Sequence, residues 1–124
     1  MNLRGIDFGN VLGASGVQGF FGEGYWFHNV WHPFGLDFSG MTLVAKTATL
    51  LSRPGNMPLT PQFTPRDYFP KCVVVKPIDA LLLNSVGLSN PGIHELMMAG
   101  EWQQLTDPFL LSIMSLADTP EKRF

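Results

Sequence analysis

Short runs of apolar residues recur along the chain, and each run is followed by a loop of polar or small residues. The runs cover residues 10–14, 41–45, 80–83 and 109–114. They are largely continuous rather than alternating, which is typical of parallel strands that are buried on both faces. We therefore predict four parallel strands, among them a buried strand over 80–83.

Aromatic residues with helical spacing follow the first run. Phe20, Phe27 and Trp31 are separated by seven and four residues, which places them on one face of a helix. We expect this aromatic stripe to belong to the core and not to stack on nucleic acid, because it lacks basic residues. Glycines weaken the first turns of this segment. The stable helix is therefore expected over 23–31, and Pro33 is expected to end it.

A second helix is expected after the run at 80–83. Asn90 has the side chain of an N-cap, Pro91 suits the first helical position, and Gly100 marks the end of the helix. The buried stripe of this helix is expected to consist of Ile93, Leu96 and Met97.

Two segments depart from the alternation of strands and helices. Residues 3–8 alternate around Gly5 and predict a short hairpin within residues 1–9. Residues 53–79 form an excursion that holds six of the ten prolines, in which 72–75 is expected to add a strand. A loop of this length in a compact domain is usually functional, as a lid or as a partner surface.

Alternating buried strands and helices predict an α/β fold with a parallel sheet and right-handed crossovers. About four strands correspond to the N-terminal part of a TIM-type (β/α)8 barrel. We predict a single partial barrel domain over residues 1–124, with a last helix that begins at Asp118 and is cut short at Phe124. Half a barrel leaves two strand edges unpaired, so we expect a homo-oligomer or a partner chain that completes the barrel.

Composition narrows the class of protein. The 124 residues are 45% hydrophobic and 15% charged, with a formal net charge of −2 and no run of Lys or Arg, which argues against nucleic-acid binding. The single Cys72 excludes an internal disulfide and fits a reducing compartment. No apolar run is long enough to span a membrane, and the N-terminus lacks a signal-peptide core. We expect a cytoplasmic protein.

Polar and small residues stand where the predicted strands end. Ser15 and Gly16 follow the first run, Lys46 follows the second, and Asn84 opens a loop over 84–92. In parallel α/β folds, loops at the carboxyl ends of strands build the ligand site. Small residues let a flat ligand approach the backbone, and a buried ammonium needs a partner. These positions therefore predict one ligand site.

Four motifs, in this order and at this spacing, resemble the dihydroorotate dehydrogenase family. The motifs are Asn10-Val-Leu-Gly-Ala-Ser-Gly16, Leu43-Val-Ala-Lys-Thr-Ala-Thr49, Arg53-Pro-Gly-Asn56 and Asn84-Ser-Val-Gly-Leu-Ser-Asn-Pro-Gly92. The run 109–115 is similar to the family's fourth barrel strand, and the last motif is similar to the soluble class 1 form. The resemblance covers the N-terminal portion of the family's longer chains.

The resemblance implies a flavoprotein oxidoreductase that binds FMN and oxidises dihydroorotate to orotate in pyrimidine biosynthesis. Ala14, Ser15 and Gly16 would contact the isoalloxazine ring, and Thr47 would contact the flavin. Lys46 would hydrogen-bond both flavin and substrate, which makes it the catalytic candidate of this chain. A lysine beside a reducible ring stabilises the charge that develops there.

The same resemblance implies the substrate contacts, for a small pyrimidine precursor. Asn84 would bind the substrate together with Lys46. The backbone of Val86, Gly87 and Leu88 would lie along the substrate carboxylate.

The family's catalytic base, a Cys or Ser beyond the fourth strand, and its phosphate site have no counterpart before Phe124. We therefore expect the isolated chain to be inactive. One alternative is a non-catalytic half-barrel remnant that acts as an interaction or structural subunit. Another is a related flavin-dependent enzyme that reduces pyrimidines on the same barrel.

Other chemistry-bearing residues are expected to be structural. His28 and His32 are four residues apart, but without a third ligand we expect packing among aromatic residues and no metal site. Cys72 is expected to be a buried small hydrophobe, and Asn90 to serve turn and cap chemistry.

Overall fold

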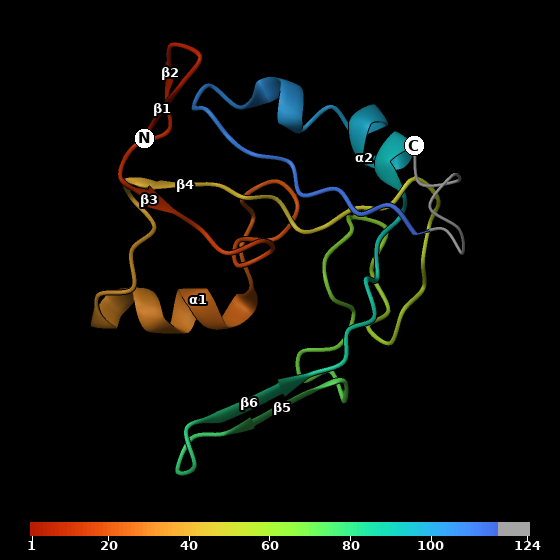
Figure 1. Cartoon of the computed structure of the whole chain (residues 1–124). Coiled ribbons are helices and arrows are strands. Elements are labelled where there is room, and N and C mark those ends of the chain that lie inside the picture. Colours follow the sequence, from red (N-terminus) through yellow and green to blue (C-terminus); the bar gives the residue numbers. More distant parts are fainter. Residues whose placement is uncertain (117–124) are drawn as a thin grey trace.

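The computed structural model describes residues 1–116 and contains a parallel ladder near the N-terminus (Figure 1). Strand β3 (Val11–Leu12) pairs in parallel with β4 (Met41–Thr42). The ladder continues past both strands, because the N–H of Gly16 donates to the carbonyl of Val44 at 3.1 Å. The two predicted runs at 10–14 and 41–45 therefore lie side by side.

The last apolar run adds a third segment to this ladder. Parallel bridges join Val44 to Leu110 and Ala48 to Ile113. The N–H groups of Ala45 and Ala48 donate to the carbonyls of Leu110 and Ser112, both at 2.9 Å. Three of the four predicted runs thus share one parallel arrangement, with the 41–48 segment in the middle.

The prediction of a buried parallel strand over 80–83 is wrong. Strand β6 (Leu81–Asn84) pairs antiparallel with β5 (Val73–Lys76), and all four residues of β6 are exposed. Closing the four-residue turn between the two strands costs far less chain entropy than a long-range parallel pairing. An apolar run alone cannot distinguish the two outcomes. Figure 1 shows the hairpin extending away from the rest of the molecule.

The N-terminal hairpin is formed as its sequence predicts. Strand β1 (Asn2–Leu3) pairs antiparallel with β2 (Ile6–Asp7). The two turn residues, Arg4 and Gly5, have φ values of +54° and +83°, as a tight two-residue hairpin turn requires.

Helix α1 (Trp26–Trp31) is shorter than the predicted helix, and the 3-10 helix η1 (His32–Phe34) follows it directly. Its predicted buried face is also wrong. Phe20 lies outside the helix and is 1% exposed, whereas Phe27 and Trp31 are 42% and 56% exposed. The carboxylate of Glu23 accepts the N–H groups of Phe20 and Phe21, which holds a turn there instead of a first helical turn.

Helix α2 (Ile93–Met98) is followed by the 3-10 helix η2 (Trp102–Gln104). Gly92 is the N-cap, so the predicted start at Asn90 and Pro91 is two residues early. Leu96 is fully buried, but Met97 is 54% exposed and does not belong to the buried stripe.

The core lies where α2 and η2 cover the middle segment of the ladder. Ala45 and Ala48 offer small side chains there, so that larger side chains approach the backbone closely. The indole N–H of Trp102 donates to the carbonyl of Phe20 at 2.8 Å, which satisfies a buried polar group on each side. The buried cluster consists of Phe20, Ala45, Ala48, Leu96 and Trp102.

No helix within residues 1–116 is long and apolar enough to cross a membrane. The helix predicted to begin at Asp118 lies outside the described residues.

Candidate functional site

A cleft of about 1600 Å³ opens at the carboxyl ends of the ladder strands. Its walls come from the strand ends, from the first residues of α1, from the proline-rich segment, from the β5–β6 hairpin and from the loop after β6. Figure 1 shows how these segments are arranged. Ala14 is exposed and is not among the lining residues. The other predicted site residues all line this cleft: Ser15, Gly16, Lys46, Thr47, Asn84, Val86, Gly87 and Leu88.

A chain of hydroxyl groups ties the three strand ends together at the floor of the cleft. Ser15 Oγ donates to the carbonyl of Ala45 at 3.0 Å and lies 2.9 Å from Thr47 Oγ1. Thr47 Oγ1 in turn lies 2.8 Å from Ser112 Oγ. Because the proton of Ser15 goes to the carbonyl, Thr47 donates to Ser15, and Ser112 donates to Thr47. One hydroxyl from each segment thus fixes the relative positions of the strand ends.

Gly16 packs directly on Lys46. A Cβ atom at position 16 would lie 3.1 Å from Cγ and 3.2 Å from Cβ of Lys46, and the φ of Gly16 is +79°. Both the close approach and the left-handed backbone favour glycine. The absence of a side chain at this position leaves the stem of the lysine against bare backbone.

The amine of Lys46 is held by a carbonyl and by an aromatic ring. Its Nζ donates to the carbonyl of Ser89 and lies 4.8 Å from the centroid of the Phe20 ring. Within residues 1–116 no carboxylate forms an ion pair with it. Burial lowers the pKa of Lys46 to about 8, because removing water penalises the charged form.

The loop that presents Ser89 is built on the Arg53-Pro-Gly-Asn56 motif. Arg53 and Asn90 exchange two backbone hydrogen bonds, of 2.8 and 2.9 Å. The N–H of Asn56 donates to the carbonyl of Val86 at 2.9 Å, and its Nδ2 donates to the carbonyl of Ser85 at 2.7 Å. Two motifs that are far apart in the sequence therefore form one backbone-to-backbone contact.

Ser89 and Asn90 are buried, at 0% and 2% exposure. Ser89 Oγ accepts the N–H of Met57 and donates to the carbonyl of Val86, both at 3.0 Å. The carboxamide of Asn90 accepts the N–H of Gly92 at 2.9 Å and donates to the carbonyl of Leu88 at 2.7 Å. Asn90 is thus a structural residue, as expected, although it stands before the cap and not at it.

The remaining predicted substrate residues form the outer wall of the cleft. Asn84 Oδ1 accepts the N–H of Val86 at 3.2 Å, and the side chain is exposed. Leu88 has a φ of +58°, which is uncommon for a residue with a branched side chain. The loop is thus held in a conformation that a free chain of the same sequence would rarely adopt.

Several lining residues were not predicted from the sequence as site residues. Tyr25 donates its hydroxyl to the carbonyl of Gly16 at 2.8 Å, and burial, with the nearby Glu23, raises its pKa to about 12. The indole N–H of Trp26 donates to the carbonyl of Tyr68 at 2.9 Å and links α1 to the proline-rich segment. The aromatic stripe at 20–31 is the sequence feature that could indicate these lining residues, but its helical spacing predicts a core face.

His28 and Cys72 are both buried. His28 packs edge-on against Phe27 and Phe38, and its Nδ1 accepts the N–H of Tyr25 at 3.1 Å. Burial and the nearby His32 lower the pKa of His28. Cys72 is buried and free. Within residues 1–116 no group of three or more His, Cys, Asp or Glu side chains is arranged to hold a metal ion.

In comparisons with known proteins, no protein-family model matches the chain, and no curated protein or solved structure matches it either.

The Gly55 position tests the contact between the two motifs. A Cβ there would lie 2.5 Å from the carbonyl oxygen of Val86 and 2.8 Å from the amide nitrogen of Ser89. Gly40 is a matched control, since it also has a positive φ (+75°) but has no atom near its Cβ position. Gly40→Ala should cost about 1 kcal/mol of unfolding free energy, and Gly55→Ala at least about 2 kcal/mol more, measured by urea denaturation. Equal losses would contradict the contact.

Proposed function

We propose that this chain is the N-terminal part of an FMN-dependent enzyme of the dihydroorotate dehydrogenase type, with a partial TIM-type barrel as its scaffold. The observation that carries the proposal is the convergence of eight residues from separate motifs in one cleft. The strand-end pattern and the resemblance both select Ser15, Gly16, Lys46 and Asn84, and the resemblance adds Thr47, Val86, Gly87 and Leu88.

The composition of the cleft fits a flat, electron-accepting ring. Ser15 and Gly16 supply a floor of small residues, and Tyr25 and Phe27 stack beside it with ring centroids 5.6 Å apart. The volume exceeds the 300–1,000 Å³ of a typical ligand pocket, so it accommodates a cofactor together with a substrate. FMN, when bound, supplies the ring that accepts a hydride from the substrate.

The polar groups of the cleft fit an anionic substrate beside that ring. Lys46 carries the amine without an acidic partner in the described residues, so its charge is available to a carboxylate or to a reduced ring. The exposed Asn84 carboxamide and the backbone at 86–88 line the same cleft. In this assignment Lys46 binds and orients, and the reaction's base comes from residues outside this sequence. The proposed location is the cytoplasm.

The test is flavin binding by the purified chain. The quenching of flavin fluorescence reports the binding. Lys46→Ala should weaken binding at least about tenfold, because a charge-assisted hydrogen bond to the ring is lost. Lys76→Ala is the matched control, since Lys76 lies on β5 outside the cleft, and it should change the affinity less than about twofold. Riboflavin should bind similarly to FMN, because the resemblance places the phosphate site outside this sequence.

Two results would contradict the proposal. One is the absence of flavin binding by a folded chain, and the other is an equal effect of the two lysine substitutions.

A second candidate function, a non-catalytic interaction subunit, is favoured by the exposed β5–β6 hairpin. Leu82, Leu83 and Val75 are 61%, 56% and 58% exposed, and Ile78 at the turn is fully exposed. An apolar two-stranded hairpin is marginal alone in water, and its outer edges can pair with another strand. We propose a second copy of this chain as its partner.

Sedimentation velocity tests this second candidate. The wild-type chain should form a dimer that Leu83→Lys weakens at least about tenfold, since the substitution places a charge in an apolar contact. Met98→Lys is the control, because Met98 is also exposed (72%) but lies on α2. A wild-type chain that stays monomeric at high concentration contradicts this candidate.

A further inference from the structure

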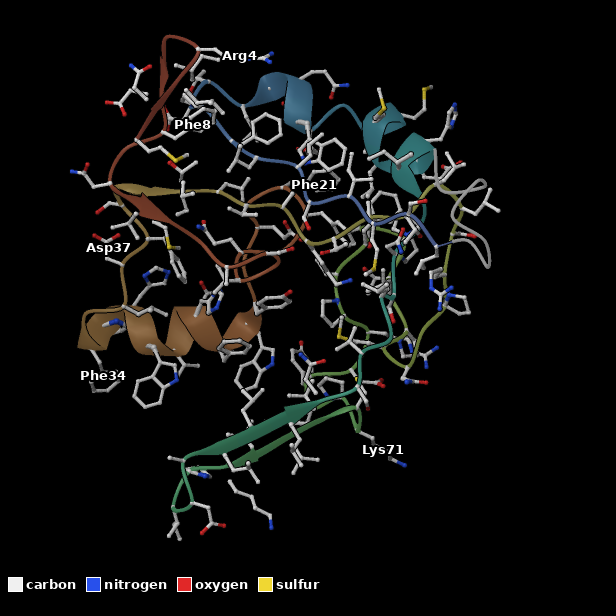
Figure 2. The ribbon with its side chains drawn as sticks, in the orientation of Figure 1. Arg4, Phe8, Phe21, Phe34, Asp37 and Lys71 are labelled. Atoms are coloured by element: carbon white, nitrogen blue, oxygen red, sulfur yellow. The ribbon has the colours of Figure 1, made fainter. Side chains whose placement is uncertain are left out.

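The amine of Lys46 is placed differently from other lysines of the described chain. Lys71 and Lys76 are exposed to solvent. Lys71 lines the rim of the same cleft as Lys46, whereas Lys76 lies outside it, and Figure 2 shows Lys71 near the foot of the hairpin with its side chain directed outward. Lys46 is partly buried beside Phe20, with the carbonyl of Ser89 as its hydrogen-bond acceptor. The three lysines therefore form an internal comparison of one buried and two solvated amines.

The contacts of Lys46 leave one direction open. One N–H points to the carbonyl of Ser89, and the ring face of Phe20 attracts a second N–H through its negative π surface. Neither contact accepts a proton or neutralises the nitrogen. In the neutral amine the lone pair is therefore the group that neither contact occupies, on a residue that lines the cleft.

We propose that Lys46 is a nucleophilic amine that condenses with small planar aldehydes and ketones entering the cleft. The neutral nitrogen adds to the carbonyl carbon while a proton moves to the carbonyl oxygen, which gives a carbinolamine. Loss of one water molecule then forms the imine. Nothing is oxidised or reduced in this step, and the reaction needs no further reactant.

The environment of Lys46 supports this chemistry. Burial without a carboxylate disfavours the ammonium form, and the pKa of about 8 gives a larger neutral fraction near neutral pH than a solvated lysine has. Desolvated lysines of this kind are the amines that form Schiff bases in enzymes. The aromatic wall of Tyr25 and Phe27 fits a planar carbonyl compound.

The inference does not rest on flavin binding, because it concerns the amine in the ligand-free chain. The probe is pyridoxal 5′-phosphate, followed by reduction of the imine with borohydride and peptide mass mapping. In the wild-type chain, the adduct should form at Lys46 at least about tenfold faster than at Lys71 or Lys76 near neutral pH. Equal rates at the three lysines would overturn the proposal, and so would faster labelling of either exposed lysine.

A variant adds a second readout. Lys46→Arg keeps the positive charge but cannot form the imine, so the fast adduct should disappear while Lys71 and Lys76 label as before. Circular dichroism checks that the variant is folded. Survival of the fast phase in this variant would contradict the assignment to Lys46, and the wild-type mapping decides the matter without any variant.

Discussion

The site depends on one backbone contact, between the segment around Gly55 and the loop at 85–90. Four backbone or side-chain hydrogen bonds join these segments through Arg53 and Asn56. Gly55 permits the approach because it has no Cβ. The contact fixes the carbonyl of Ser89, and that carbonyl holds the amine of Lys46. The position of the key cation therefore follows from how closely two loops pack, and not from an ion pair.

A cation placed in this way has consequences for chemistry. A carboxylate partner would stabilise the ammonium and satisfy it permanently. A carbonyl and a ring face hold the nitrogen in place but leave its charge unneutralised. Such a group is available both to an anionic ligand and, when neutral, to a carbonyl carbon. The proposed flavin and substrate contacts and the proposed imine chemistry are two uses of the same arrangement.

The sequence pattern predicted the strand ends well, because polar and small residues that follow a buried apolar run lie at the end of the strand. Ser15 and Lys46 meet at one cleft for this reason, whereas the loop after Asn84 lines the cleft from an antiparallel hairpin. The pattern failed where local pairing competed with long-range pairing, as at Leu81–Asn84, because an apolar run has the same sequence in either sheet.

Contacts made by the proline-rich segment were also beyond prediction. The indole N–H of Trp26 donates to the backbone carbonyl of Tyr68. Because every residue has a backbone carbonyl, the sequence does not indicate which one accepts this hydrogen bond. The same is true of the hydroxyl of Tyr25, which bonds the carbonyl of Gly16. Spacing suggested a buried aromatic face, whereas the side chains of Tyr25, Trp26 and Phe27 form a wall of the cleft. Helical periodicity assigns residues to a face but does not say what that face covers.

The most direct test of the central claim is a ¹H–¹⁵N correlation spectrum of the labelled chain during titration with FMN. If the strand ends and the loop after β6 form one flavin site, the amide signals of Gly16, Lys46 and Gly87 shift together along one binding curve. The amide of Ile78, at the exposed turn of the hairpin, should stay in place. Shifts confined to the hairpin, or separate binding curves for Gly16 and Gly87, would contradict a single site.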